Sequence, residues 1–204
     1  LLESAGYHIG YTGKGWAPGD WRRCGRRRNP AGPLYNDRRL APPVDTAISA
    51  TDYAANFDDF LTARPAGVPF YFWYGGHEPH RKYIPGEGRR AGKRLEDVAT
   101  IPPYWPQEDL VREDMLDYAY ETEWFDEQLG RMLARLEELG ELDNTLVVVT
   151  SDNGAPFPRV KGQMYDDDFR LPLALMWADR ITSGRRIDDI LSFTDLSATF
   201  LEAA

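Results

Sequence analysis

Three groups of polar residues, each placed directly after an apolar segment, could together bind an anion and a metal ion. They occupy residues 13–15 (GKG), 75–80 (GGHEPH) and 151–154 (SDNG). The lysine and the histidines supply cations that would face an anionic substrate. Aspartate and asparagine supply only oxygen ligands, which suit Ca²⁺ or Mg²⁺ better than zinc. These residue types therefore favour chemistry on a negatively charged substrate.

Each group also has a purely structural explanation. An Asp-Asn-Gly sequence after a strand is an ordinary turn, and Gly-Lys-Gly is an ordinary loop. His77 and His80 could form a zinc pair, but the sequence shows no third soft ligand. Pro79 also argues against presentation of the two histidines on a helix. Taken singly, the motifs leave the structural and the functional interpretation open.

The apolar pattern around these groups alternates between strands and helices. It predicts strands over 7–12, 69–74, 145–150 and 171–177, and helices over 51–63, 109–139 and 193–204. This alternation is typical of an α/β fold with a mainly parallel sheet. Ligands in such folds bind beyond the carboxyl ends of the strands. If the strands are parallel neighbours, we expect the three polar groups to converge on one pocket.

Two of the predicted helices have clear apolar faces. Thr51 or Asp52 could cap the first helix. Its apolar face is formed by Tyr53, Phe57, Phe60 and Leu61. The second helix ends at Gly140. A stripe of mostly apolar residues recurs at steps of three and four, and its members Tyr118, Phe125 and Met132 are expected in the core: Val111, Met115, Tyr118, Thr122, Phe125, Leu129, Met132, Leu136 and Leu139.

Length and composition exclude several classes of protein. The 204 residues carry a net charge of −9, with 42% hydrophobic and 28% charged residues, as expected for a globular domain with a real core. Such an acidic chain is a poor general binder of nucleic acid. No apolar run approaches the roughly 18 residues of a membrane span. The single cysteine, Cys24, excludes an internal disulfide framework and a multi-cysteine zinc site.

Residues 17–45 form a long predicted surface loop rich in Pro, Gly and Arg. Seven arginines and two aspartates within 20–40 give this part a local charge of about +5, so the rest of the chain carries about −14. The arginines could form a solvated loop, or they could line the rim of a site for an anionic polymer. The sequence leaves both interpretations open.

Taken together and in order, three segments resemble the sulfatase family of the alkaline-phosphatase-like superfamily. They are 5–19 (AGYHIGYTGKGWAPG), 69–83 (PFYFWYGGHEPHRKY) and 150–173 (TSDNGAPFPRVKGQMYDDDFRLPL), and they are most similar to the heparan N-sulfatase (sulfamidase) branch. The resemblance implies a three-layer α/β sandwich with a mainly parallel central sheet, of which residues 1–204 would be a partial catalytic domain. It also implies metal-assisted hydrolysis of a sulfate ester or sulfamate, on a sulfated small molecule or a polysaccharide such as a glycosaminoglycan.

The resemblance assigns roles to five residues. Asp152 and Asn153 match a pair of Ca²⁺ ligands, for which Mg²⁺ is an alternative ion. Lys14 matches the lysine that contacts the sulfate and the catalytic formylglycine. His80 matches a histidine that holds a sulfate oxygen and assists the leaving group, and Lys161 matches a basic residue that binds sulfate. His77, by contrast, matches a motif position without a firm catalytic role.

Several features depart from the family pattern. Cys24 lies after Lys14 rather than before it and does not match the nucleophile, so a formylglycine and an Asp-Asp metal pair are expected upstream of Leu1. We therefore expect the chain to be an internal piece of a longer protein. Trp16 stands where many relatives have a histidine, and three aspartates, 166–168, replace part of a Tyr-Glu-Gly-Gly stretch. Family analogy favours an exported or lysosome-like location, and the oligomeric state stays open.

Two other functions remain as alternatives. The first is a phosphoesterase or phosphonate hydrolase of the same superfamily, which an upstream Ser or Thr nucleophile would indicate. The second is a non-catalytic paralogue that binds anions, which an inert residue at the nucleophile position would indicate.

Overall fold

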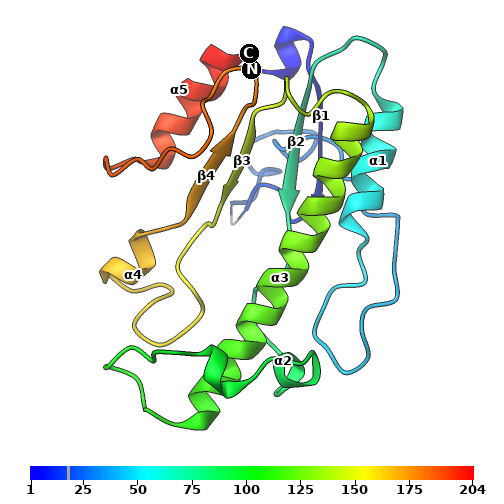
Figure 1. Cartoon of the computed structure of the whole chain (residues 1–204). Coiled ribbons are helices and arrows are strands. Elements are labelled where there is room, and N and C mark those ends of the chain that lie inside the picture. The colour runs from blue at the N-terminus through cyan, green and yellow to red at the C-terminus, as the bar shows by residue number, and fades with distance from the viewer. Residues whose placement is uncertain (18) are drawn as a thin grey trace. The chain divides into compact units, whose positions relative to one another are not determined.

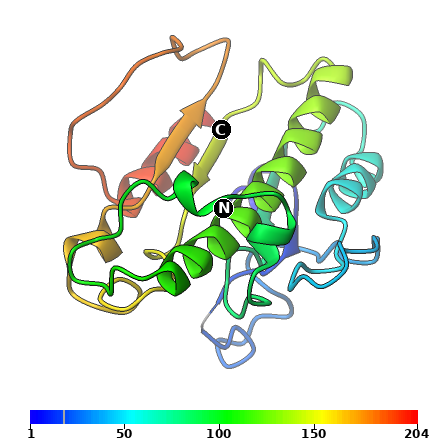
Figure 2. The same cartoon turned by 60° about the horizontal axis from the view of Figure 1, so that its bottom comes forward.

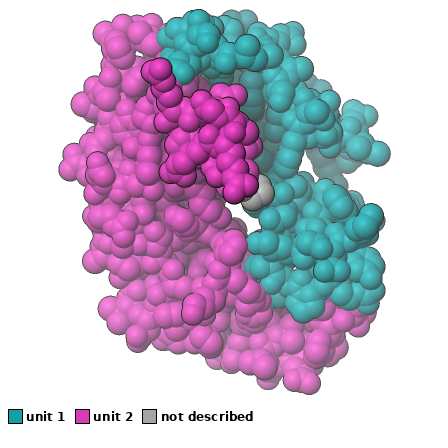
Figure 3. All heavy atoms as spheres, turned by 180° about the vertical axis from the view of Figure 1, so that it is seen from behind, with its two compact units in different colours: residues 1–7, 133–204 teal, residues 8–132 magenta. Residues whose placement is uncertain are grey.

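The computed structural model describes residues 1–17 and 19–204, which divide into two compact units. Unit 2 comprises His8–Met132, and unit 1 comprises Leu1–Tyr7 with Leu133–Ala204 (Figure 3). In the part of the chain that the structure describes, none of the helices is both long and apolar enough to cross a membrane.

A parallel strand pair forms the centre of unit 2 (Figure 1). Strand β1 (His8–Gly13) pairs with β2 (Phe70–Gly75), and their last residues, Gly13 and Gly75, stand opposite each other. Both strands were predicted from the sequence, and their parallel pairing is confirmed. Most residues of β2 are half-buried, and Trp73 is exposed.

Helix α1 (Tyr53–Ala63) packs on β1 and begins as predicted. Asp52 is the N-cap, and its carboxylate accepts the Ala55 N–H at 3.1 Å, which satisfies one of the free donors of the first turn. The predicted apolar face is the buried face: Tyr53, Phe57, Phe60 and Leu61. Phe57 and Phe60 contact the β2 aromatic Phe72, with ring centroids 4.8 and 4.7 Å apart.

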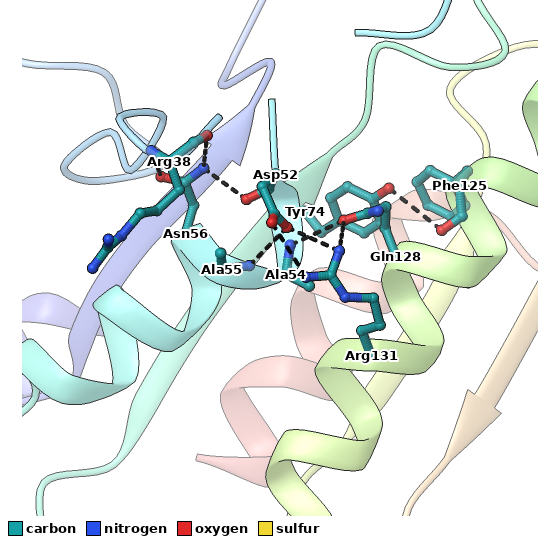
Figure 4. A network of polar contacts seen from close by, with 9 residues as sticks. All are labelled: Arg38, Asp52, Ala54, Ala55, Asn56, Tyr74, Phe125, Gln128 and Arg131. Carbon is teal, nitrogen blue, oxygen red and sulfur yellow. Dashed lines mark hydrogen bonds and ion pairs between the residues drawn. The ribbon is translucent and has the colours of Figure 1, made fainter. Parts of the chain in front are cut away.

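The long helix α3 (Asp109–Glu138) is joined to α1 by polar contacts (Figure 4). The Gln128 side-chain oxygen accepts the Ala54 N–H at 3.2 Å, and Arg131 forms an ion pair with Asp52 at 2.9 Å. Tyr74 of β2 stacks on Phe125 of α3, with ring centroids 4.4 Å apart. These contacts fix the α3 face that lies over the strands of unit 2.

The buried stripe of α3 differs from the predicted one. Met132 is buried as expected, whereas Tyr118 and Phe125 are half-buried and Thr122 is exposed. Beside the apolar Leu116, Met132 and Leu136, the buried positions of α3 carry the polar side chains Asp117, Glu121 and Gln128. Apolar periodicity does not predict these positions, because each side chain has a polar partner: backbone N–H groups for Asp117 and Gln128, and the Glu87 carboxyl for Glu121.

Two short helical turns lie between β2 and α3. They are α2 (Glu87–Arg90) and the 3₁₀ turn η2 (Leu95–Asp97). Gly88 of α2 sits directly on α3, where a Cβ would overlap the Leu116 carbonyl oxygen. Asp117 accepts the N–H groups of Gly86 and Gly88 at 2.9 and 2.8 Å.

Unit 1 contains a second strand pair, β3 (Val147–Thr150) with β4 (Leu173–Met176). The pair is antiparallel, in contrast to the parallel pairing of β1 with β2. Parallel neighbours need a crossover, usually through a helix, whereas the only helix between β3 and β4 within the described chain is α4 (Asp166–Phe169), a single turn. The predicted C-terminal helix is α5 (Phe193–Ala203), capped by Ser192, and it lies alongside this pair (Figure 2). A 3₁₀ turn, η1 (Glu3–Ala5), completes the unit.

Candidate active-site residues

Lys14 is held at the carboxyl end of β1 by its backbone. The Lys14 N–H donates to the Gly75 carbonyl at 2.6 Å, and the Trp73 indole N–H donates to the Lys14 carbonyl at 2.9 Å. Both partners belong to the end of β2, so the two strand ends are tied together at Lys14. The side chain of Lys14 is exposed, which leaves its ammonium available to an anion.

Two glycines make this close approach of the strand ends possible. Gly13 has φ 75°, which a residue with a Cβ adopts only with strain, and a Cβ there would overlap the Gly75 carbonyl. A Cβ on Gly75 would in turn overlap the Lys14 carbonyl. Asn36 completes the turn, because its side-chain oxygen accepts the Gly13 N–H and the Thr12 hydroxyl, each at 2.8 Å. Sequence reasoning missed Asn36, which lies in the arginine-rich loop and carries no local signal.

The second polar group forms a tight turn beside Lys14. The His80 N–H donates to the His77 carbonyl at 2.9 Å, so residues 77–80 make a β-turn that brings both histidines to the same surface. The prediction that Pro79 prevents a helix here agrees with this turn.

The orientation of the His80 ring follows from one contact. His80 Nδ1 lies 2.5 Å from the Arg81 carbonyl oxygen. A carbonyl only accepts hydrogen bonds, so Nδ1 carries the proton in this contact. In the neutral ring, Nε2 is then the acceptor, and the ring is exposed. His80 can therefore hold or deliver a proton at Nε2.

Lys14 and His80 lie close enough to His77 for their positive charges to affect its pKa. Partial burial lowers the pKa of His77, and the positive charges of Lys14 and His80 lower it further, while Glu78 opposes them. A neutral His77 limits the repulsion within a cluster that already holds Lys14. The parallel pairing of β1 and β2 thus brings Lys14, His77 and His80 together, as predicted.

Glu78, within this turn, forms buried hydrogen bonds that hold the turn in place. Sequence reasoning missed this residue as well. The side chain is buried, and its carboxylate accepts the Ser49 N–H at 2.6 Å and the Tyr53 hydroxyl at 2.8 Å. The Tyr53 oxygen also accepts the His77 N–H at 3.1 Å. Burial and the Glu78 charge raise the pKa of Tyr53, which keeps the phenol protonated. The position of Glu78 between two polar residues of the motif was the only available sequence signal.

Unit 1 holds the third polar group after β3, on a closely packed loop. Gly154 is buried, and it has no room for a side chain, since a Cβ there would lie 2.5 Å from the Asp167 carbonyl oxygen. Asp168 accepts the Gly154 N–H at 3.0 Å and the Gln163 N–H at 3.1 Å, so one carboxylate ties both ends of loop 154–163. Lys161 lies half-buried within this loop, and its N–H donates to the Ala155 carbonyl at 3.2 Å.

The aspartates 166–168, which depart from the family pattern, follow the loop that carries Lys161. The Asp168 carboxylate is occupied by the backbone of this loop. Asp166 is exposed and lies in the first turn of α4.

Asp152 and Asn153 fit part of the coordination shell of a hard cation. The Asp152 carboxylate is exposed, and the Asn153 side-chain nitrogen donates to the Gly154 carbonyl at 2.8 Å, which leaves the amide oxygen as the remaining donor to a metal. Ca²⁺ takes six to eight oxygen ligands, so this pair supplies a minority of them. Within residues 1–17 and 19–204, no group of three or more His, Cys, Asp or Glu side chains could hold a metal ion. The zinc interpretation of His77 and His80 thus gains no third ligand from the described residues.

Comparison with known proteins identifies the family. The Sulfatase family model matches residues 1–204. The chain is 34% identical over 137 residues to an ulvan-active sulfatase of Formosa agariphila, covering 67% of this chain and 23% of that protein. It is 37% identical over 236 residues to an N-acetylglucosamine-6-O-sulfatase of Bacteroides thetaiotaomicron, covering 76% of this chain and 42% of that protein.

A human relative and a solved structure extend this comparison. The chain is 26% identical over 157 residues to the human N-sulphoglucosamine sulphohydrolase, covering 66% of this chain and 31% of the human protein. It therefore spans less than half the length of these three relatives. A crystal structure from Bacteroides fragilis, assigned as the sulfatase yidJ, superposes with a TM-score of 0.69 at 22% identity, over 98% of this chain and 53% of that one. The fold is the α/β fold of the alkaline-phosphatase-like superfamily, and the chain belongs to the sulfatase family.

Proposed function

We propose that residues 1–204 form part of the catalytic domain of an enzyme that hydrolyses sulfate esters or sulfamates on sulfated glycans. The three relatives named above are two sulfatases and a sulphohydrolase, and two of their names specify an amino sugar. These names favour sulfate removal over the phosphoesterase alternative.

One observation carries the proposal for this chain. The ends of β1 and β2 bring the ammonium of Lys14 and the imidazole of His80 to one surface, on a backbone frame fixed by Gly13 and Gly75. A sulfate group carries negative charge that shifts during S–O or S–N cleavage, and cations fixed in advance stabilise it more than water does. The hydrogen bonds of the strand ends fix the backbone that presents Lys14 before any substrate binds.

Each proposed residue has a distinct role. Lys14 binds a sulfate oxygen through its ammonium. His80 is a proton carrier at Nε2, because Nδ1 is committed to the Arg81 carbonyl, and the proton assists the leaving oxygen or nitrogen. Lys161 is a second sulfate-binding cation, presented by the loop that Asp168 ties together.

Asp152 and Asn153 are proposed as oxygen ligands of a divalent ion, with Ca²⁺ favoured and Mg²⁺ as the alternative. A bound ion of this kind supplies Lewis-acid stabilisation of sulfate charge, and the family's formylglycine supplies the nucleophile. The test of metal binding on this chain is Ca²⁺ titration followed by calorimetry, in which Asp152→Ala should weaken binding while Asp166→Ala should not.

The activity is tested in the full-length enzyme by measuring sulfate release from sulfated monosaccharides and from heparan sulfate. Lys14→Ala and His80→Asn should each lower kcat/KM by about 10²-fold or more, as expected for loss of a charge-stabilising group. Arg89→Ala is the matched control, because it removes one exposed cation from α2. Undiminished turnover in both site variants would contradict the assigned roles, and hydrolysis of the matching monosaccharide phosphate esters in place of the sulfate esters would favour the phosphoesterase.

A further inference from the structure

A short segment of the loop after β1 carries a dense positive charge in an acidic chain. Residues 20–28, called here the arginine turn, contain five arginines in seven consecutive positions, Arg22 to Arg28, and all five are exposed. Because the whole chain has a net charge of −9, this segment is a local exception to its electrostatics. Basic runs of five to eight residues are typical of patches that bind polyanions such as heparin.

The arginine turn is an ordered structure. The Asp20 side chain accepts the Arg22 N–H at 3.0 Å, as in the first turn of a helix. The Asp20, Trp21 and Arg22 carbonyls then accept the N–H groups of residues 23, 24 and 25 at 3.0–3.2 Å. The Arg22 guanidinium lies over the Trp21 ring at 4.3 Å, which orients one of the cations. A structured backbone presents these arginines at lower entropic cost than a flexible tail would.

The arginine turn is anchored beside Lys14. Asn29 follows it, and the Asn29 side chain accepts the Trp16 N–H at 3.0 Å and donates to the Trp16 carbonyl at 3.1 Å. These two hydrogen bonds close the loop onto the residue two positions after Lys14. Gly15 allows this closure, since a Cβ there would lie 2.8 Å from the Asn29 amide nitrogen. The loop ends are therefore fixed to the same strand end that presents the candidate sulfate-binding lysine.

Most of the positive charge in the arginine turn is not neutralised by acids. Asp20 pairs with Arg23 at 3.6 Å, whereas Arg26 and Arg27 make no ion pair within the described chain. Arg38, further along the same loop, shows the contrast, because it forms a bidentate pair with Asp59 at 2.6 and 2.8 Å. Arg38 has an internal partner, and Arg26 and Arg27 remain available for an external anion.

We propose that the arginine turn binds additional sulfate groups of the same polyanionic chain whose target sulfate reaches Lys14. This rests on the proposed function and names its substrate class, a polysulfated polysaccharide. A guanidinium group can donate two parallel N–H hydrogen bonds to two oxygens of one sulfate group. A nucleic acid is disfavoured because the rest of the chain carries about −14, which opposes contact with an extended phosphate backbone over a wide surface.

Binding of the 204-residue chain to immobilised heparin tests this inference without requiring turnover. The triple variant Arg22→Ala/Arg26→Ala/Arg27→Ala should bind about tenfold more weakly or worse. The control Arg89→Ala/Arg185→Ala/Arg186→Ala also removes three exposed positive charges and should change affinity less than about twofold. Thermal melting of both variants should match the parent, since the altered side chains are exposed.

Cys24 provides a second readout in the unaltered protein. It is the only cysteine of the chain, it is exposed, and it lies inside the arginine turn. Bound heparin should slow alkylation of Cys24 several-fold, and salt should abolish the protection because the contacts are ionic.

Three outcomes would overturn the inference: equal loss of affinity in both triple variants, unchanged binding in the arginine-turn variant, or equal competition by single-stranded DNA of matched charge. Failure of the proposed function has a different signature, which is absence of sulfate release from every substrate by the unaltered full-length enzyme. In an active enzyme, the arginine-turn variant should raise KM for heparan sulfate and leave kcat for a sulfated monosaccharide unchanged.

Discussion

Glu121 of α3 and Glu87 of α2 form a buried pair of carboxyl groups, each side chain only 1% exposed. Glu87 Oε2 accepts the Ala47 N–H at 2.8 Å. The Oε1 atoms of Glu87 and Glu121 are buried, and apart from the contact between the two carboxyl groups they have no hydrogen-bond partner among the described residues. Two carboxylates only accept hydrogen bonds, so contact between them requires a proton. Desolvation, with the charge of Glu87 next, raises the pKa of Glu121 to about 8, and burial also raises the pKa of Glu87.

This pair predicts that unit 2 is more stable at acidic than at alkaline pH. The folded-state pKa of Glu121 lies above its unfolded value near 4.5, so its contribution is complete below about pH 4.5 and is lost as pH rises through about 8. Among the described residues, the other charged or titratable groups coupled to Glu121 are Glu78, Asp117, Tyr83 and Tyr120, none of which is a cation.

Glu121→Gln should flatten the pH dependence of the melting temperature. We expect the variant to melt at least about 3 °C above the parent at pH 8.5 and no higher than it at pH 5. Glu127→Gln, an exposed position on the same helix, is the control and should follow the parent curve. Parallel curves for parent and Glu121→Gln would show that Glu121 is ionised throughout.

The glycine contacts at the strand ends predict opposite effects of two alanine substitutions. Gly75→Ala should destabilise the protein by more than about 2 kcal/mol, because its Cβ would overlap the Lys14 carbonyl. Gly130→Ala, in the interior of α3, meets no atom within 4 Å and should stabilise the helix by about 0.5–1 kcal/mol. Urea denaturation of both variants measures the difference, and a neutral Gly75→Ala would mean that the strand ends can separate.

Asp52 has two roles that substitution can separate. It caps α1 through the Ala55 N–H and forms an ion pair with Arg131 (Figure 4). Asp52→Asn keeps a capping oxygen and loses the ion pair, so it should cost less than about 1 kcal/mol, whereas Asp52→Ala loses both and should cost about 1–2 kcal/mol. Equal losses in chemical denaturation would indicate that the ion pair carries the whole effect.

Asp168 should control the order of the loop that carries Lys161. Asp168→Ala removes the acceptor of the Gly154 and Gln163 N–H groups, so hydrogen exchange at these two amides should accelerate by about tenfold or more. Asp166→Ala, two residues earlier in α4 and exposed, should leave both rates unchanged. Slow exchange in Asp168→Ala would show that the buried glycine alone holds the loop.

Local patterns were sufficient to predict much of the fold. Alternating apolar segments correctly placed the strands, and the cap and apolar face of α1 follow from neighbouring residues. The buried face of α3 could not be predicted in the same way. Its Asp117 and Glu121 are buried because N–H groups and a carboxyl from the distant segment 86–88 meet them, and such partners leave no periodic signal.

The candidate site shows the same division. Lys14, His77 and His80 are brought together because they follow two parallel neighbouring strands, which the sequence could predict. Glu78, Tyr53 and Asn36 were missed, since their roles depend on hydrogen bonds between parts of the chain that are 23 to 29 residues apart. The antiparallel return of β4 follows a connection whose only helix among the described residues is the single turn α4, and the alternation of longer elements did not predict it.

The frame around Lys14 has a consequence for how this site can diversify. Backbone carbonyls, two glycines and Asn36 fix the path of residues 13–16, and the side chains of Lys14 and Trp16 contribute none of the hydrogen bonds that hold the strand ends. The framework of the strand ends and the chemistry of the side chains at positions 14 and 16 are therefore independent of each other. A substitution at position 16 can change what this surface binds and leave the backbone path of residues 13–16 in place.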